Sequence, residues 1–85
     1  MIETNFTLLN ETGFHARPAS VFVKAATAFK SEVFIIKDDE SYNAKSIMGL
    51  LSMGAGKGTK ILLQVSGEDE SSASEELLEI LRNMD

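Results

Sequence analysis

The stretch EVFIIKDDESYNA, residues 32–44, joins a strand signal to a turn signal. Residues 32–37 are rich in β-branched and aromatic side chains, which favour a β-strand. The residues DDE that follow are typical of a turn, and a short edge strand is expected at 41–44. Two strands joined by so short a connection form a hairpin, so the sequence predicts an antiparallel pair here.

On the N-terminal side of the hairpin, we expect one strand and one helix. In ETNFTLL, residues 3–9, Thr4, Phe6 and Leu8 alternate with polar neighbours, which is the pattern of a half-buried strand. Residues 16–30 carry apolar side chains three or four positions apart, as one face of a helix requires. These positions are Ala19, Phe22, Val23, Ala26 and Phe29.

On the C-terminal side, we expect a helix, a strand and a closing helix. Ser46 is a good N-cap for a short helix over 47–53, and Gly54 can adopt the left-handed conformation that ends it. TKILLQVSG, residues 59–67, has the apolar content of a buried strand. Residues 68–85 are amphipathic, with acidic side chains in the first turn. Their expected inward positions are Ala73, Leu77, Ile80, Leu81 and Met84.

The resulting order is strand, helix, strand, strand, helix, strand, helix, which predicts an α+β fold of a single domain, residues 1–85. We expect an open-faced two-layer sandwich, in which helices cover one face of the sheet and the other face meets solvent. A chain of 85 residues has room for one hydrophobic core, so any binding site should be shallow.

Composition argues against several classes of protein. The chain has no cysteine and one histidine, so no metal site is expected. GAGKGT, residues 54–59, does not match a nucleotide-binding loop, and no cofactor is expected. A net charge of −5 argues against nucleic acid as a partner. Neither a signal peptide nor an apolar run near the roughly 20 residues of a membrane span is visible, so we expect a cytoplasmic protein without membrane insertion.

GFHARPAS, residues 13–20, places the only histidine directly before the first expected helix. The first turn of a helix presents backbone N–H groups without intrahelical acceptors, and these favour an anion. A neutral imidazole, with an ordinary pKa of about 6.5, can accept a phosphoryl group. On His15, such a group could meet the N–H groups of Ala16 and Arg17 and the Arg17 guanidinium. Pro18 suits this first turn, where its missing N–H costs no helical hydrogen bond.

A second interpretation of His15 is open at this point, in which it is only a solvated capping residue beside an arginine. The chain has no second histidine, no cysteine and no acid at a known spacing from His15, which argues against a self-sufficient hydrolase. The sequence therefore favours a residue on which other proteins act over an enzyme.

Ser46 also allows two interpretations. Its hydroxyl can cap the helix at 47–53, or it can be a phosphorylation site at the edge of a docking surface. The second interpretation depends on apolar side chains that occupy more than one side of this short helix. We expect Ile47, Met48 and Leu51 to form an exposed patch that binds partner proteins.

GFHARPAS together with KSIMGLLSMGAGKG, residues 45–58, resembles the HPr family, the histidine-containing phosphocarrier proteins of the bacterial sugar phosphotransferase system. The resemblance extends nearly end to end, in length and in element order. It implies a four-stranded antiparallel sheet with strand order 1-4-2-3 and three helices on one face. It also implies a carrier of phosphoryl groups that is not itself an enzyme.

By this resemblance, phosphorylated enzyme I transfers a phosphoryl group to Nδ1 of His15, which passes it to sugar-specific EIIA proteins or domains. Arg17 would stabilise the transferring group, and Pro18 would hold the first turn. Ser46 matches the site that HPr kinase/phosphorylase phosphorylates with ATP in low-GC Gram-positive bacteria. The resulting form binds the catabolite-control transcription regulator. The docking surface that these partners share would include Ile47, Met48 and Leu51.

Two positions depart from the family pattern. Phe14 stands where a smaller aliphatic residue is common, and Gly56 interrupts an AKG that often precedes the last strand. We expect Phe14 to alter the rim around His15. The catabolite-repression paralogue Crh keeps the serine but lacks the histidine, so His15 favours a phosphocarrier over a Crh protein.

Overall fold

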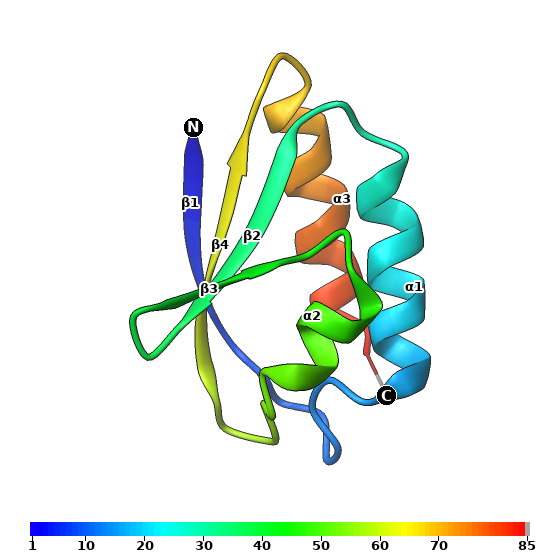
Figure 1. Cartoon of the computed structure of the whole chain (residues 1–85), viewed down its shortest axis with the longest axis vertical. Helices are drawn as coiled ribbons and strands as arrows, with labels where there is room; N and C mark the ends of the chain where they lie inside the picture. The colour runs from blue at the N-terminus through cyan, green and yellow to red at the C-terminus, as the bar shows by residue number, and fades with distance from the viewer. Residues whose placement is uncertain (85) are drawn as a thin grey trace.

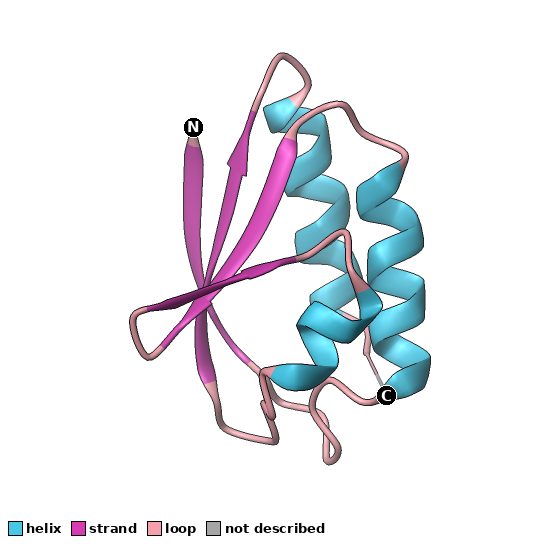
Figure 2. Ribbon diagram, viewed as in Figure 1, coloured by secondary structure: helices cyan, strands magenta, loops and turns pink. Residues whose placement is uncertain are grey.

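Four strands form one sheet in this structure, a computed structural model that describes residues 1–84 (Figure 1). In chain order the elements are β1 (Ile2–Thr7), α1 (Ala16–Thr27), β2 (Glu32–Lys37), β3 (Glu40–Asn43), α2 (Ile47–Ser52), β4 (Lys60–Ser66) and α3 (Glu70–Arg82). The strands lie in the order β1-β4-β2-β3, and each neighbouring pair is antiparallel. The helices stand on one side of the sheet (Figure 2). The predicted α+β class, open-faced sandwich and strand order 1-4-2-3 are confirmed.

The predicted hairpin is formed by β2 and β3, in which Lys37 pairs with Glu40. The two residues between them, Asp38 and Asp39, both have positive φ, at 51° and 66°. Positive φ at both central residues matches the right-handed twist of the flanking strands, and aspartate tolerates this conformation better than most residues. The turn signal in the sequence therefore corresponds to a tight two-residue connection.

The core lies between the sheet and the helices, because alternate residues of each strand point to the covered face. On β4, which lies between β1 and β2, Ile61, Leu63 and Val65 are buried. The predicted inward face of α1 packs against this side of the sheet, with Phe29 only partly buried at its end. The fully or nearly buried residues of that face are Ala19, Phe22, Val23 and Ala26.

Helix α1 is shorter than predicted and ends at Thr27 instead of residue 30. The N–H of Ala28 donates to the carbonyl of Ala25, three residues back, at 3.2 Å. Such a bond tightens the last turn and closes the helix. The sequence 16–30 carried the apolar spacing of a longer helix, but the chain turns toward β2 before that pattern is complete.

Helix α3 differs from its prediction in extent and in its inward face. It spans Glu70–Arg82 instead of 68–85, and residue 85 lies outside the described residues. Its positions Ala73, Leu77 and Leu81 are buried as predicted, together with Ser74. The expectation of inward positions at Ile80 and Met84 is only partly met, since both are half-exposed and line a pocket beside α1.

The loop before α3 and the loop after α1 both lie at the top of Figure 1. Asp69 joins them. Its carboxylate accepts hydrogen bonds from the backbone N–H groups of Lys30 (2.8 Å) and Ser31 (2.9 Å) and from the Ser31 hydroxyl. The Ser31 hydroxyl, followed by the Lys30 N–H, lowers the pKa of Asp69 below its ordinary value, because both stabilise the ionised carboxylate.

We expect Asp69→Asn to destabilise the protein at neutral pH and much less in acid. Because the pKa of Asp69 is lower in the folded than in the unfolded chain, its ionised form stabilises the fold above the unfolded-state pKa of about 3.9. This contribution is lost as the pH falls through the folded-state pKa. The difference in urea unfolding free energy between wild type and Asp69→Asn should therefore shrink below about pH 4.

A matched variant isolates the hydroxyl. Ser31→Ala removes the largest cause of the pKa shift but leaves the carboxylate and both backbone bonds in place. At neutral pH, the difference in unfolding free energy between wild type and Ser31→Ala should be smaller than that for Asp69→Asn. This difference should also shrink in acid. A difference between wild type and Asp69→Asn that stays constant from neutral to acidic pH would contradict the assignment.

Candidate functional site

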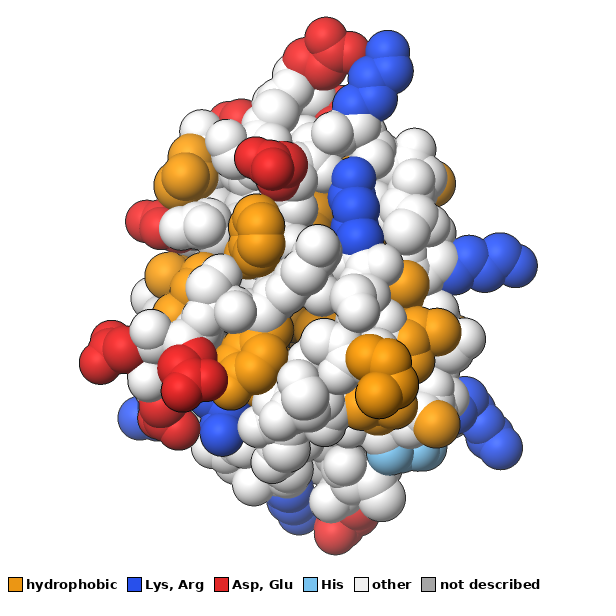
Figure 3. Space-filling view, viewed as in Figure 1, with side chains coloured by type: hydrophobic (Ala, Val, Ile, Leu, Met, Phe, Trp, Pro, Cys, Tyr) orange, Lys and Arg blue, Asp and Glu red, His pale blue; other side chains and the backbone are white. Residues whose placement is uncertain are grey.

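His15 is the N-cap residue of α1, directly before the first helical residue, Ala16. Its backbone is extended, with φ −109°, and its carbonyl accepts a hydrogen bond from the N–H of Ala19 at 3.0 Å. Its side chain makes no capping hydrogen bond. The ring is partly exposed and lies at the surface of the face shown in Figure 3. The predicted helix start is confirmed, and the imidazole is not used to cap the helix.

Two backbone donors stand at the start of α1. Pro18 has no N–H, and the N–H of Ala19 is already bonded to the carbonyl of His15. The N–H groups of Ala16 and Arg17 therefore have no acceptor within the helix. The first turn contains no acidic residue, and the Arg17 side chain is exposed. This end of α1 is electropositive and suits an anion on the neighbouring ring.

The loop that leads to His15 is held by contacts with the segment after α2. The N–H of Phe14 donates to the carbonyl of Ala55 at 3.0 Å, and the Asn10 side-chain amide donates to the carbonyl of Gly13 at 2.7 Å. Gly13 has φ +58°, a conformation that glycine adopts without strain. The position of His15 thus depends on Ala55, which is about 40 positions away in the chain, as well as on the helix that follows His15.

Phe14, one of the two departures from the family pattern, is buried directly before His15, and its effect on the rim around the ring stays a prediction. Phe14 is only 5% exposed, and its ring packs edge-on against Phe22, with centroids 5.5 Å apart and planes at 83°. Aromatic pairs favour this geometry. Phe14 therefore anchors the loop to the core immediately before His15.

Ser46 is the N-cap of α2, as predicted. Its Oγ accepts a hydrogen bond from the N–H of Gly49 at 3.1 Å. Within α2, Leu50 is fully buried, so the side of this short helix that carries Leu50 faces the core. Gly54 follows the helix with φ +64°, the left-handed conformation expected at its end.

The predicted apolar patch on α2 is exposed. Ile47, Met48 and Leu51 are 41%, 75% and 36% exposed. In Figure 3 hydrophobic side chains gather over α2 and the start of α1, next to the histidine. Helix α2 packs against α1, so the fold brings this patch close to the start of α1 although about 30 residues separate them in the chain. Its role in docking stays a prediction.

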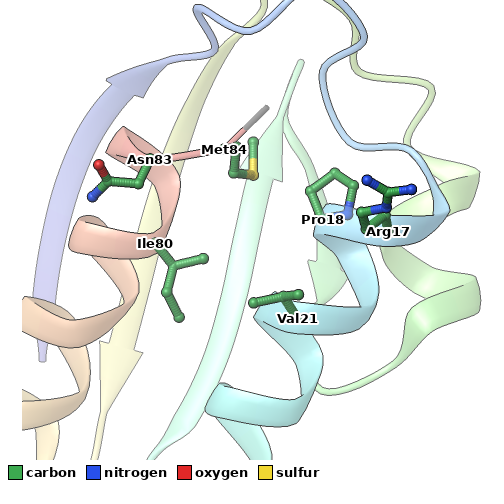
Figure 4. Close-up of a pocket in the computed structure, with 6 residues that line it drawn as sticks. All are labelled: Arg17, Pro18, Val21, Ile80, Asn83 and Met84. Atoms are coloured by element: carbon green, nitrogen blue, oxygen red, sulfur yellow. The ribbon is translucent and has the colours of Figure 1, made fainter.

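A pocket that the sequence analysis did not predict lies between the start of α1 and the end of α3 (Figure 4). Its volume is about 200 Å³, and its lining residues are Arg17, Pro18, Val21, Ile80, Asn83 and Met84. Val21 is 52% exposed, because the spacing that turns Phe22 and Val23 inward turns Val21 outward. An outward valine was therefore visible in the sequence, but its proximity to α3 was not.

Within residues 1–84, no three histidine, cysteine or acidic side chains gather as a metal ion would require. No helix of this part reaches the length and apolar content needed to cross a bilayer.

Comparison with known proteins matches residues 2–83 to the family described as the PTS HPr component phosphorylation site. The chain is 47% identical over 78 residues to the HPr-like protein Crh of Halalkalibacterium halodurans, covering 92% of this chain and 93% of the relative. It is 41% identical over 81 residues to the phosphocarrier protein HPr of Neisseria meningitidis, covering 95% and 91%. The crystal structure of HPr-C-His from Thermoanaerobacter tengcongensis has a TM-score of 0.93 at 40% identity, covering 96% and 92%.

Proposed function

We propose that this chain, which belongs to the HPr family of the phosphotransferase system, carries its phosphoryl group on His15. Phosphocarriers of this family act with the enzymes of the system and are not enzymes themselves. The proposal for His15 rests on one observation: the ring lies at the N-cap of α1, partly exposed and without a capping hydrogen bond. By the family resemblance, the donor is phosphorylated enzyme I and the acceptors are EIIA proteins or domains.

The proposed transfer is a substitution at phosphorus. The lone pair of a neutral imidazole nitrogen of His15, Nδ1 by resemblance, bonds to phosphorus, and the electron pair of the breaking bond stays with the donor atom. The second transfer reverses these roles, with an acceptor atom attacking the phosphorus and the pair returning to His15. Neither transfer requires a redox partner.

The first turn of α1 supplies the groups that stabilise this transfer. The N–H groups of Ala16 and Arg17, and the Arg17 guanidinium, would donate to the phosphoryl oxygens as negative charge concentrates there. Pro18 is buried, and its ring restricts the backbone of the turn that holds these donors. In this proposal Arg17 touches the transferred group, whereas Pro18 only positions the donors.

The test is incubation with phosphoenolpyruvate and enzyme I. We expect an acid-labile phosphate on His15 of the wild type and none on His15→Ala. His15→Ala should keep the thermal unfolding of the wild type, because the side chain makes no capping hydrogen bond, so a lost acceptor can be told from a lost fold. A wild-type protein that takes up no acid-labile phosphate would contradict the proposed function.

A second, regulatory function is proposed for Ser46. Two observations favour it, namely the 47% identity to a Crh protein and the place of Ser46 at the edge of the exposed patch on α2. HPr kinase/phosphorylase would add a phosphate there, which a helix N-terminus tolerates. The phosphate would place about −1.5 to −2 charges beside Ile47 and change which partners bind, including the catabolite-control transcription regulator. His15 favours the carrier function over a purely Crh-like one, and both can coexist.

We expect Ser46→Ala to abolish labelling by ATP and HPr kinase/phosphorylase and to lower the free energy of unfolding by about 1 kcal/mol, since the variant loses the N-cap bond to Gly49. Radiolabelling and urea unfolding measure the two effects. Ser52→Ala is a matched control at the other end of α2, where the hydroxyl donates to the Gly49 carbonyl, and this variant should still be labelled. Label that persists in Ser46→Ala would refute the regulatory function.

A further inference from the structure

Methionine supplies all the sulfur in this chain, and its four residues differ in their access to solvent. The chain has no cysteine, so no thiol competes for oxidants. Met53 is only 3% exposed, and Met84 is half-exposed beside α1. Met1 and Met48 are 67% and 75% exposed. A hydroperoxide in solution therefore reaches the thioethers of Met1 and Met48 more readily than that of Met53.

Met48 is held outward by the way in which α2 is anchored. Leu50 is fully buried, and Met48 lies two positions before it, about 200° away around the helix axis. The hydrogen bond from the Gly49 N–H to Ser46 Oγ fixes the start of the helix in this orientation. The Met48 thioether thus cannot turn toward the core without unwinding α2. It is the most exposed of the large hydrophobic side chains in residues 1–84.

The two exposed thioethers lie at opposite ends of the molecule. Met48 belongs to the exposed patch on α2, which lies next to the histidine in Figure 3. The ammonium group of Met1 pairs with Glu70, at the start of α3, at 3.0 Å. In Figure 1 this end of the chain is far from the start of α1. A change at Met48 therefore alters the surface beside His15, whereas a change at Met1 does not.

We propose that Met48 is a reversible oxidation site through which hydroperoxides weaken the binding of enzyme I. The thioether sulfur attacks one oxygen of the hydroperoxide, the O–O bond breaks, and a sulfoxide forms together with water or an alcohol. Sulfur loses two electrons, which the peroxide gains. A methionine sulfoxide reductase reverses the step by oxidising two thiols to a disulfide and releasing water. The inference rests on the proposed function, in which enzyme I is the phosphoryl donor.

Oxidation at Met48 changes the polarity of the patch. The thioether is apolar and flexible, which suits contact with a partner surface. The sulfoxide oxygen is a hydrogen-bond acceptor, and its burial in an interface without a donor is unfavourable. We expect the KM of enzyme I for this chain to rise about tenfold with kcat nearly unchanged, because the weakened contact is made equally before and during transfer.

The test compares the wild type before and after treatment with hydrogen peroxide, which is removed before phosphoenolpyruvate and enzyme I are added. Peptide mass spectrometry should find an added oxygen at Met48 well before it appears at Met53. The KM should then rise as stated, and reductases for both sulfoxide epimers should restore it. Thermal unfolding should stay unchanged, because Met48 lies outside the hydrophobic core.

Two variants separate Met48 from the other methionines, each compared with its own untreated form. Met48→Leu keeps an apolar side chain of similar volume but carries no sulfur at this position, so peroxide should not change its KM. Met84→Leu removes the half-exposed thioether beside α1 and should still show the rise of about tenfold. Both variants retain Met1 and Met53, so oxidation there is present in every sample.

The outcomes distinguish this inference from the proposed function. If the wild type accepts phosphate and keeps its KM after oxidation of Met48, the inference is wrong and the proposed function stands. A rise of the same size in treated Met48→Leu, or oxidation of Met53 as fast as that of Met48, would also overturn the inference. An untreated wild type that takes up no acid-labile phosphate instead overturns the proposed function.

Discussion

Phe22→Ala should lower the free energy of unfolding by roughly 3–5 kcal/mol. Phe22 is fully buried on the inward face of α1 and is the largest of the fully buried side chains in residues 1–84. Its ring also supports Phe14 through the edge-on contact at 5.5 Å. Removal of the ring leaves a cavity and takes away the surface on which the loop before His15 is anchored. Urea unfolding measures the loss.

The neighbouring residue is a matched control for Phe22→Ala. Val21 lies on the same helix but is 52% exposed. Val21→Ala should change the free energy of unfolding by about 0.5 kcal/mol or less, because it removes little buried surface. A loss below about 1 kcal/mol for Phe22→Ala, or equal losses for both variants, would mean that the inward face of α1 is assigned wrongly.

Gly13→Ala should lower the free energy of unfolding by roughly 2–5 kcal/mol, for two reasons that add. At φ +58° an alanine is strained by the left-handed backbone. A Cβ atom there would also meet the backbone of the facing loop, including the carbonyl oxygen of Ala55 and, at 2.7 Å, the Cα of Gly56. Both obstacles are main-chain atoms, so the loops must move apart. Chemical denaturation measures the combined effect.

Gly54→Ala separates the two contributions. Gly54 has nearly the same conformation, φ +64°, but no atom lies within 4 Å of the position of its Cβ. Gly54→Ala should therefore cost only about 1–2 kcal/mol, the conformational part alone. Equal losses of stability in the two variants would contradict the close approach of the two loops at Gly13.

Gly13→Ala should also impair the proposed phosphoryl transfer, whereas Gly54→Ala should not. A shift of residues 13 and 14 moves His15 relative to the first turn of α1, and a displacement near 1 Å can cost about 100-fold in rate. Phosphate uptake from enzyme I at a temperature where both variants are folded measures this effect. Normal uptake by folded Gly13→Ala would show that the loop contact does not position His15.

Much of the fold follows from local patterns that a single sequence displays. The apolar content of residues 59–67 predicted the buried strand that β4 forms, and the structure adds that Ile61, Leu63 and Val65 are its buried positions, because successive strand residues point to opposite faces. The hairpin at residues 32–44 and the N-cap at Ser46 depend only on nearby backbone groups, and both appear in the structure. The strand order is different, since it came from the family resemblance and not from any spacing within the chain.

The candidate site, like the fold, was predicted only in part from the sequence. Its helix start at His15 and the exposed side of α2 follow from spacing along the chain. Ile80 and Met84 share the apolar spacing of Leu77 and Leu81, yet they face a pocket, because the distance between α1 and α3 is set by the whole core and not by either helix. Burial of Phe14 likewise required knowledge that Phe22 lies against it.

The amino-acid order alone was enough for the elements, for most of the inward faces of α1 and α3, and for the two residues with chemical potential, His15 and Ser46, because periodicity and helix capping act over a few neighbouring positions. Contacts between distant segments emerged only in the folded chain. Asp69 bonds to Ser31, 38 residues away, and Phe14 bonds to Ala55. Such contacts depend on how helices and loops pack on the sheet, which spacing along the chain does not encode.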